Sequence, residues 1–129
     1  MSDHLRIQTS VTDDVRIIEC QGELDIATAP DVETIVRGLV GHGAARVRLD
    51  WSGLTFMDST GIRLLLEVVA LCREQKVDLT WDLGPNAQRA LDAVGIDDEL
   101  LASYAWPESH DGPTGINAPS SLPDQSESR

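Results

Sequence analysis

Hydrophobic and polar residues alternate with a period of two along four segments of this chain. That period predicts β-strands with one side facing a core, because successive side chains of a strand point to opposite faces. The four segments are 5–11, 15–21, 46–51 and 77–83. The turn Thr12-Asp13-Asp14 separates the first two and predicts a hairpin. The alternation falters at Ile17-Ile18, which leaves open either a strand covered on both faces or a bulge.

Helical periodicity, with apolar residues at i, i+3, i+4 and i+7, marks other segments of the chain. One helix is expected to begin with Thr28 as its N-cap and to be closed by Gly41. Its apolar stripe is Val32, Ile35, Val36 and Leu39. A later helix is expected to start at Gly84-Pro85-Asn86 and to end at Gly95, with the face Ala87, Ala90, Leu91 and Val94. Residues 96–101 are expected to form a short acidic helix or an irregular segment.

The longest helical pattern covers residues 63–74 and follows the stretch Phe56-Met57-Asp58-Ser59-Thr60-Gly61-Ile62. Asp58, Ser59 and Thr60 all suit an N-cap, since their short side chains accept from unpaired backbone N–H groups. The helix has two apolar stripes, one of Ile62, Leu65, Leu66, Val69 and Cys72 and one of Leu64, Val68 and Leu71. Such a helix is expected to be wedged between a sheet and another helix, and part of the surface near Ser59 is a candidate docking site for another protein.

The loops before these helices carry the candidate chemistry. A glycine-permitted bend followed by loop acids is expected at Gly22-Glu23-Leu24-Asp25, and the segment Ser52–Thr55 is expected to link a strand to the central helix. A helix start tolerates an added phosphate well, because unpaired N–H groups and the positive end of the helix dipole favour negative charge. The hydroxyl pair Ser59 and Thr60 therefore lies where a phosphoryl group would be stabilised.

These motifs resemble those of the STAS domain family, and most closely its bacterial anti-sigma factor antagonists. The resemblance spans about residues 5 to 105 and rests on Asp58-Ser59-Thr60-Gly61-Ile62 after an apolar strand, with Gly22-Glu23-Leu24-Asp25 and Ala27-Thr28-Ala29-Pro30 upstream. It implies an α/β fold with a mixed β-sheet of four or five strands and helices packed mainly on one face. The resemblance also places Asp25 close to the phosphorylatable serine, which matches Ser59.

The resemblance implies a function in partner switching that controls transcription, as in a stress response. The unphosphorylated protein would bind an anti-sigma factor that is also a serine kinase, and a sigma factor would be freed. Phosphorylation of Ser59 would end the complex, and a phosphatase would reset it. The implied partner-binding residues are Asp25, Asp58, Ser59, Thr60 and Gly61. In the alternative function, the chain is a non-switching STAS scaffold in a signalling assembly or transport system.

Composition narrows the choice of function. The 129 residues carry a formal net charge of −12, which argues against a nucleic-acid phosphate backbone or an anionic membrane as partner. No Gly-x-Ser-x-Gly, Walker A or Gly-x-Gly-x-x-Gly sequence occurs, and the three histidines are scattered, so neither an enzyme nor a cofactor is expected. Cys20 and Cys72 suggest buried thiols rather than a disulfide or a zinc site.

The organisation expected is a STAS domain at 1–106 and a disordered acidic, Pro/Ser-rich tail at 107–129. Tyr104-Ala105-Trp106 is expected to pack against the body of the domain. No secretory signal and no apolar run of membrane-spanning length occur, so a cytoplasmic protein, monomeric when free, is expected.

Overall fold

A computed structural model describes residues 4–105 of the chain. Its strands are β1 (Leu5–Thr12), β2 (Val15–Leu24), β3 (Arg46–Met57) and β4 (Asp78–Asp82). Its helices are α1 (Ala29–Gly41), α2 (Ser59–Glu74), α3 (Gly84–Ala93) and α4 (Asp98–Tyr104). Trp106 and the predicted tail at 107–129 lie outside the described residues, so the domain boundary stays a prediction.

The strands form one mixed sheet in the order β1-β2-β3-β4. β1 and β2 pair antiparallel across a turn in which Asp13 and Asp14 adopt positive φ angles of 52° and 69°. β2 with β3 and β3 with β4 pair in parallel. The α/β class, the mixed four-stranded sheet and the hairpin are therefore as predicted. Ile17 and Ile18 pair in regular register with both β1 and β3, so no bulge lies at these residues. Register shifts occur only later, at Glu19/Gln21 and Gly22/Glu23 of the β2–β3 pairing, and β3 carries the extra residue each time.

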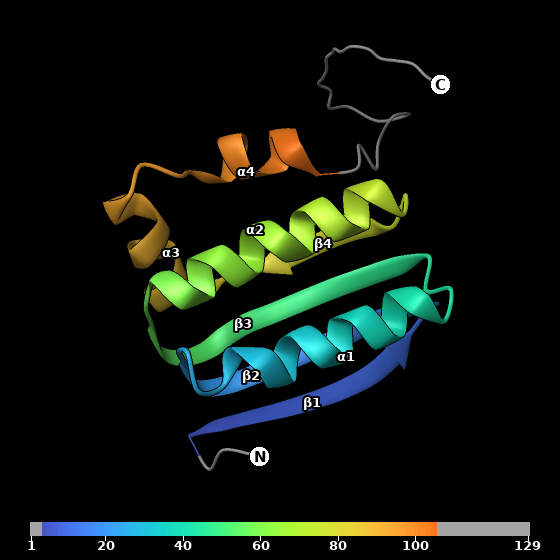
Figure 1. Ribbon diagram of the computed structural model, residues 1–129, viewed down its shortest axis with the longest axis horizontal. Coiled ribbons are helices and arrows are strands. Elements are labelled where there is room, and N and C mark those ends of the chain that lie inside the picture. Colours follow the sequence, from blue (N-terminus) through green and yellow to red (C-terminus); the bar gives the residue numbers. More distant parts are fainter. Residues whose placement is uncertain (1–3, 106–129) are drawn as a thin grey trace.

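Helices α1 and α2 lie side by side across one face of the sheet, while α3 contacts β3 and α4 contacts α2 (Figure 1). The core lies between this face and the helices. Its largest fully buried side chains are Trp51, Ile18, Leu24, Leu49, Leu65, Leu91, Leu101, Val32, Val36, Val47, Val68 and Val69. On β3, Val47, Leu49 and Trp51 all point inward, as their alternation predicts.

Helix α2 is wedged between the sheet and α1, as its two apolar stripes predict. Leu65, Val69 and Cys72 are buried from one stripe, and Leu64 and Val68 are buried from the other. The assignment of Leu66 to the core is wrong, because its side chain is 37% exposed. Val94 on the α3 face and Val11 on β1 are also more exposed than predicted, at 58% and 56%. Each lies near the end of its element, beyond the part that another layer covers.

The second and third strands are longer than predicted. β2 continues through Gly22-Glu23-Leu24, where a bend was expected. β3 continues to Met57, through the segment Ser52–Thr55 where a linking loop was expected. The two extensions pair with each other across the register shifts, and Leu54 and Met57 are buried there. A bulge disturbs the alternation of buried and exposed side chains. The end of the strand therefore cannot be recognised from the sequence pattern, although its backbone pairing continues.

Two predicted helix ends also need correction. Gly41 is the last residue of α1 rather than the residue that closes it, and Gly43 adopts the positive φ of 88° beyond the end. His42 lies between them, is exposed, and its ring Nδ1 is 2.7 Å from the carbonyl oxygen of Gly38. Helix α2 begins at Ser59, one turn before the predicted segment 63–74. Residues 96–101 resolve into an irregular start and the first part of α4.

Cys20 and Cys72 are free and buried, as expected. Burial raises the pKa of the Cys20 thiol to about 12 and that of the Cys72 thiol to about 11. Both thiols therefore stay protonated at neutral pH and are poor nucleophiles. Among residues 4–105, no helix combines the length and the apolar character needed to cross a bilayer.

Candidate functional site

The candidate site lies where β2 and β3 end beside each other. Leu24 and Met57 are the last paired residues of these strands, and the Asp58 N–H donates to the Leu24 carbonyl at 3.4 Å. Parallel strands end at the same edge of a sheet, so the loop after β2 and the start of α2 are neighbours at the left edge of Figure 1. The structure thus brings Asp25, next to Leu24, to the edge that carries Asp58 and Ser59.

Asp58 is the N-cap of α2. Its backbone is extended, and its Oδ1 accepts from the Thr60 N–H at 2.9 Å. Its carbonyl oxygen accepts from the Gly61 N–H at 3.0 Å and from the Ile62 N–H at 3.3 Å. Of the three N-cap candidates, the structure selects Asp58, so a capping role for Thr60 is wrong. Ser59 is the first residue of the helix, and its side chain is exposed.

Gly61 is buried beneath this surface, directly behind the helix start. A Cβ at this position would lie 2.8 Å from the Met57 sulfur and 3.2 Å from Leu24 Cδ2. The glycine therefore lets α2 approach the ends of β2 and β3 closely. Because Gly61 has no side chain, α2 can pack closely within the domain. This packing sets the position of Ser59 at the edge.

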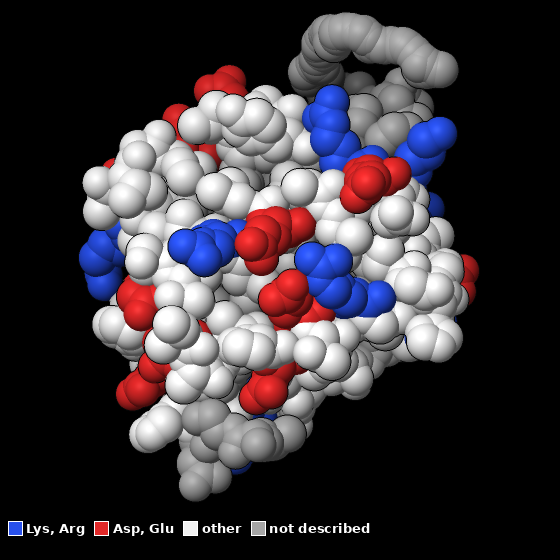
Figure 2. Space-filling model, viewed as in Figure 1, with Lys and Arg blue, Asp and Glu red and all other residues white. Residues whose placement is uncertain are grey.

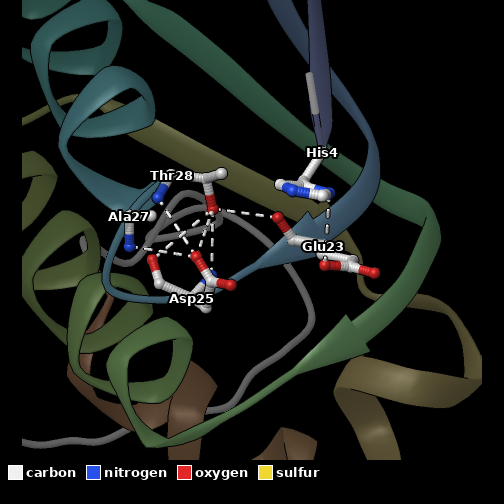
Figure 3. Close-up of polar contacts among 5 residues, drawn as sticks. All are labelled: His4, Glu23, Asp25, Ala27 and Thr28. Atoms are coloured by element: carbon white, nitrogen blue, oxygen red, sulfur yellow. Dashed lines mark hydrogen bonds and ion pairs between the residues drawn. The ribbon is translucent and has the colours of Figure 1, made fainter. Parts of the chain in front are cut away.

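The loop after β2 is held by hydrogen bonds centred on Asp25 and Thr28 (Figure 3). Asp25 Oδ1 accepts from the Ala27 N–H at 3.0 Å and from the Thr28 N–H at 3.2 Å. The Thr28 hydroxyl is fully buried, donates to the Glu23 carbonyl at 2.9 Å and accepts from the Asp25 N–H at 2.9 Å. Thr28 is at the N-cap position of α1, but the expected side-chain cap is absent, because its hydroxyl is used by the preceding loop.

Sequence reasoning missed this loop structure. The Asp25-x-x-Thr28 spacing is itself a signal, because an Asp side chain often accepts from backbone N–H groups two and three residues later. At the N-terminal side of the loop, His4 Nδ1 lies 3.8 Å from Glu23 Oε1, and the Glu23 N–H donates to the His4 carbonyl at 2.8 Å. These contacts tie the start of β1 to the end of β2.

Removal of the Asp58 cap should weaken the domain without unfolding it. Asp58→Ala leaves the Thr60 N–H without its acceptor, and such a loss costs about 1 kcal/mol of the free energy of unfolding. Asp58→Asn keeps a side-chain acceptor and should cost only a few tenths of that value. Urea unfolding measures both. Equal losses for the two variants would contradict a capping role and indicate that the carboxylate charge matters more.

The face that α1 and α2 form carries acidic and basic side chains side by side (Figure 2). Glu33 and Arg37 of α1 form an ion pair there, with 2.9 Å between Arg37 Nε and Glu33 Oε2. No continuous basic surface is present on this face. Within residues 4–105, no group of three or more His, Cys, Asp or Glu side chains is arranged to hold a metal ion.

Comparison with known proteins supports an assignment for this arrangement. The family model of the STAS domain matches residues 6–108. The chain belongs to the STAS domain family. An anti-sigma-B factor antagonist of Staphylococcus epidermidis is 28% identical over 97 residues, which cover 74% of this chain and 89% of that protein. The protein of the same name from Staphylococcus aureus strain NCTC 8325 / PS 47 is 25% identical over 96 residues, with the same coverage.

Solved structures share the STAS fold described above. An anti-sigma factor antagonist from Mycobacterium paratuberculosis superposes with a TM-score of 0.65 at 21% identity, over 86% of this chain and 92% of that one. The phosphorylated form of the Bacillus cell fate determinant SpoIIAA gives a TM-score of 0.54 at 18% identity, over 87% and 92%. At these identities the likeness establishes the fold alone.

Proposed function

We propose that this STAS domain antagonises an anti-sigma factor and that phosphorylation of Ser59 controls the antagonism. The observation that carries the proposal is the placement of Ser59: exposed, first in its helix, and at the edge that also bears Asp25 and Asp58. Relatives at 25–28% identity are named as anti-sigma-B factor antagonists, which supports the choice of partner class. The proposed partner-binding set is Asp25, Asp58, Ser59, Thr60 and Gly61, of which Gly61 contributes from beneath the surface.

The proposed cycle has two chemical steps. The anti-sigma factor is also a serine kinase and transfers the γ-phosphoryl group of ATP to the Ser59 hydroxyl, which yields phosphoserine and ADP. The phosphorylated protein then leaves the complex. A phosphatase hydrolyses the phosphoserine with water, releases inorganic phosphate and restores the binding form. A sigma factor is free for as long as the unphosphorylated protein occupies the anti-sigma factor.

The local hydrogen bonds support a phosphate that faces outward. The N–H groups of Thr60, Gly61 and Ile62 all donate to Asp58, so they are not open to a phosphate on Ser59. The helix dipole still stabilises the added negative charge. The phosphate would therefore leave the fold intact and place a charge of about −1.5 to −2 on the surface that meets the partner. The existence of solved phosphorylated and unphosphorylated forms of SpoIIAA, which has the same fold, is consistent with such a modification.

Phosphate transfer in vitro tests the proposal. Incubation of the full chain with ATP and the anti-sigma kinase from the same organism should place one phosphate on Ser59, located by peptide mass spectrometry. Ser59→Ala should abolish this incorporation, because the acceptor oxygen is lost. Thr60 is the internal control, since it is the adjacent hydroxyl and its side chain is less exposed. Phosphate on other residues only, or on none, would favour the alternative of a non-switching scaffold.

A further inference from the structure

Ile26 is an unusual feature of the surface beside Ser59. Its side chain is 78% exposed, the largest value among the large hydrophobic residues that the structure describes. It lies at the tip of the loop between β2 and α1. A single exposed hydrophobic residue is ordinary in itself, and Val11 and Val94 are also more than half exposed. What distinguishes Ile26 is the way in which its backbone is held.

The residues on both sides of Ile26 are fixed by hydrogen bonds (Figure 3). Asp25 Oδ1 binds the N–H groups of Ala27 and Thr28, and the Ala29 N–H donates to the Asp25 carbonyl at 2.8 Å. The Thr28 hydroxyl binds the Asp25 N–H from within the domain. These hydrogen bonds hold the backbone on both sides of Ile26 in place before any partner arrives. Such preorganisation of the backbone lowers the entropy cost of binding, which favours a tight contact through a single residue.

The Ile26 tip is also continuous with the proposed binding surface. Leu24, two residues before Ile26, accepts a hydrogen bond from the Asp58 N–H, which directly precedes Ser59. Any protein that covers Ser59 and Asp25 must also approach the tip. The Asp25 carboxylate, in contrast, is half-buried, and one of its oxygens is committed to the loop.

We infer that Ile26 is the apolar anchor for the anti-sigma factor and inserts into an apolar pocket of that partner. Asp25, one of the proposed partner-binding residues, then contributes to binding as a positioning residue that holds Ile26 in place, not by direct contact with the partner. The inference rests on the proposed function and adds a residue to it. It also supplies a reason why a phosphate ends the complex. An apolar contact excludes water, and a phosphoserine at its border would lose hydration without gaining a partner charge.

Binding of the full chain to the kinase that phosphorylates Ser59, measured by calorimetry with ADP in place of ATP, tests the inference. Ile26→Ser should weaken binding at least about tenfold, as expected for an anchor at the centre of an interface. Val11→Ser is the matched control, because Val11 is another exposed β-branched residue and lies near the β1–β2 turn, at the far end of β2. It should change the affinity less than about twofold. Equal effects of the two variants would overturn the inference.

The role of Asp25 has its own test. Asp25→Asn keeps an oxygen acceptor for the loop and should bind within about threefold of the wild type, whereas Asp25→Ala should lose about tenfold. If Asp25 acts through Ile26, the double variant Asp25→Ala/Ile26→Ser should bind about as well as Ile26→Ser alone. If the carboxylate itself contacts the partner, Asn and Ala will lose equally and the losses will add.

The two proposals fail in different ways. If the wild type binds no kinase, or if phosphorylation at Ser59 leaves binding unchanged, the proposed function fails and the inference with it. If phosphorylation weakens binding while Ile26→Ser does not, the switch stands and the anchor is overturned. Far-ultraviolet circular dichroism of each variant establishes that the loss is not caused by unfolding.

Discussion

Ser59→Asp should lower the affinity for the anti-sigma factor by about a hundredfold. Ser59 is exposed at the start of α2, and a partner that contacts its hydroxyl must pack closely against this position. A carboxylate there brings a negative charge into the contact, beside the acids Asp25 and Asp58. Like charges and unpaired desolvated charges at an interface cost several kcal/mol, and each 1.4 kcal/mol corresponds to about a factor of ten. Isothermal titration calorimetry of the variant and of the unphosphorylated wild type with the anti-sigma factor measures the change.

Ser59→Asn is the matched control for this experiment. Asparagine has nearly the shape of aspartate without its charge, so it should retain most of the affinity that aspartate loses. Ser59→Asp should not destabilise the domain, because an acid in the first turn of a helix is favoured by about 0.3–1 kcal/mol. The Tm of Ser59→Asp should therefore equal or slightly exceed that of the wild type. A loss of similar size in both variants would point to shape rather than charge, and no loss in either would favour the scaffold.

Gly22→Ala should cost about 2–4 kcal/mol of the free energy of unfolding, a large part of the ~5–15 kcal/mol that holds a domain of this size together. Gly22 lies in β2 at a φ of 115°, a backbone conformation that side-chain-bearing residues rarely adopt. A Cβ there would overlap the His4 carbonyl oxygen and would lie 3.3 Å from Leu5 Cα. These are backbone atoms at the start of β1 and of the residue before it, so relief requires the beginning of the strand to move.

Gly38→Ala provides the control in the same chain. Gly38 lies within α1, and a Cβ at this position would meet nothing within 4 Å. Alanine is favoured over glycine in a helix by about 0.8–1 kcal/mol, so this variant should be more stable than the wild type. Urea unfolding of Gly22→Ala and Gly38→Ala shows whether glycine is required at position 22 in particular, or whether any replacement of glycine by alanine lowers the stability. A Gly22→Ala loss below about 0.5 kcal/mol would contradict the predicted strain.

The proposed switch and the fold place different demands on neighbouring residues of the site. Gly61 and Thr28 are buried and serve packing and loop structure, whereas Ser59 and Ile26 are exposed and make few contacts within the domain. Substitutions of Gly61 or Thr28 should therefore mainly lower the free energy of unfolding. Substitutions of Ser59 or Ile26 should mainly lower the affinity for the partner, with little effect on stability.

The sequence by itself determined the strongest periodic features of this protein. The alternation of Val47, Leu49 and Trp51 and the double stripe of α2 were sufficient, because each repeats over several turns or residues and one face is buried throughout. The Asp-Ser-Thr-Gly motif supplied the N-cap candidates, although the helical pattern was recognised only from residue 63, and together with the two upstream motifs it indicated the family. Asp58, Ser59 and Thr60 all have side chains that can accept a capping hydrogen bond, so the sequence could not show which of them is the N-cap.

Only the tertiary structure decided the features that depend on partners distant in the chain. The strand character of residues 22–24 and 52–57 comes from their pairing with each other, and the extra residues of β3 at the two register shifts disturb its period of two. The need for glycine at position 61 comes from Met57 and Leu24, and the role of the Thr28 hydroxyl comes from the Glu23 carbonyl. Burial, close approach and the neighbouring ends of parallel strands are properties of packed layers. The sequence pattern shows which residues are compatible with burial or close packing. The tertiary structure determines which residues they contact.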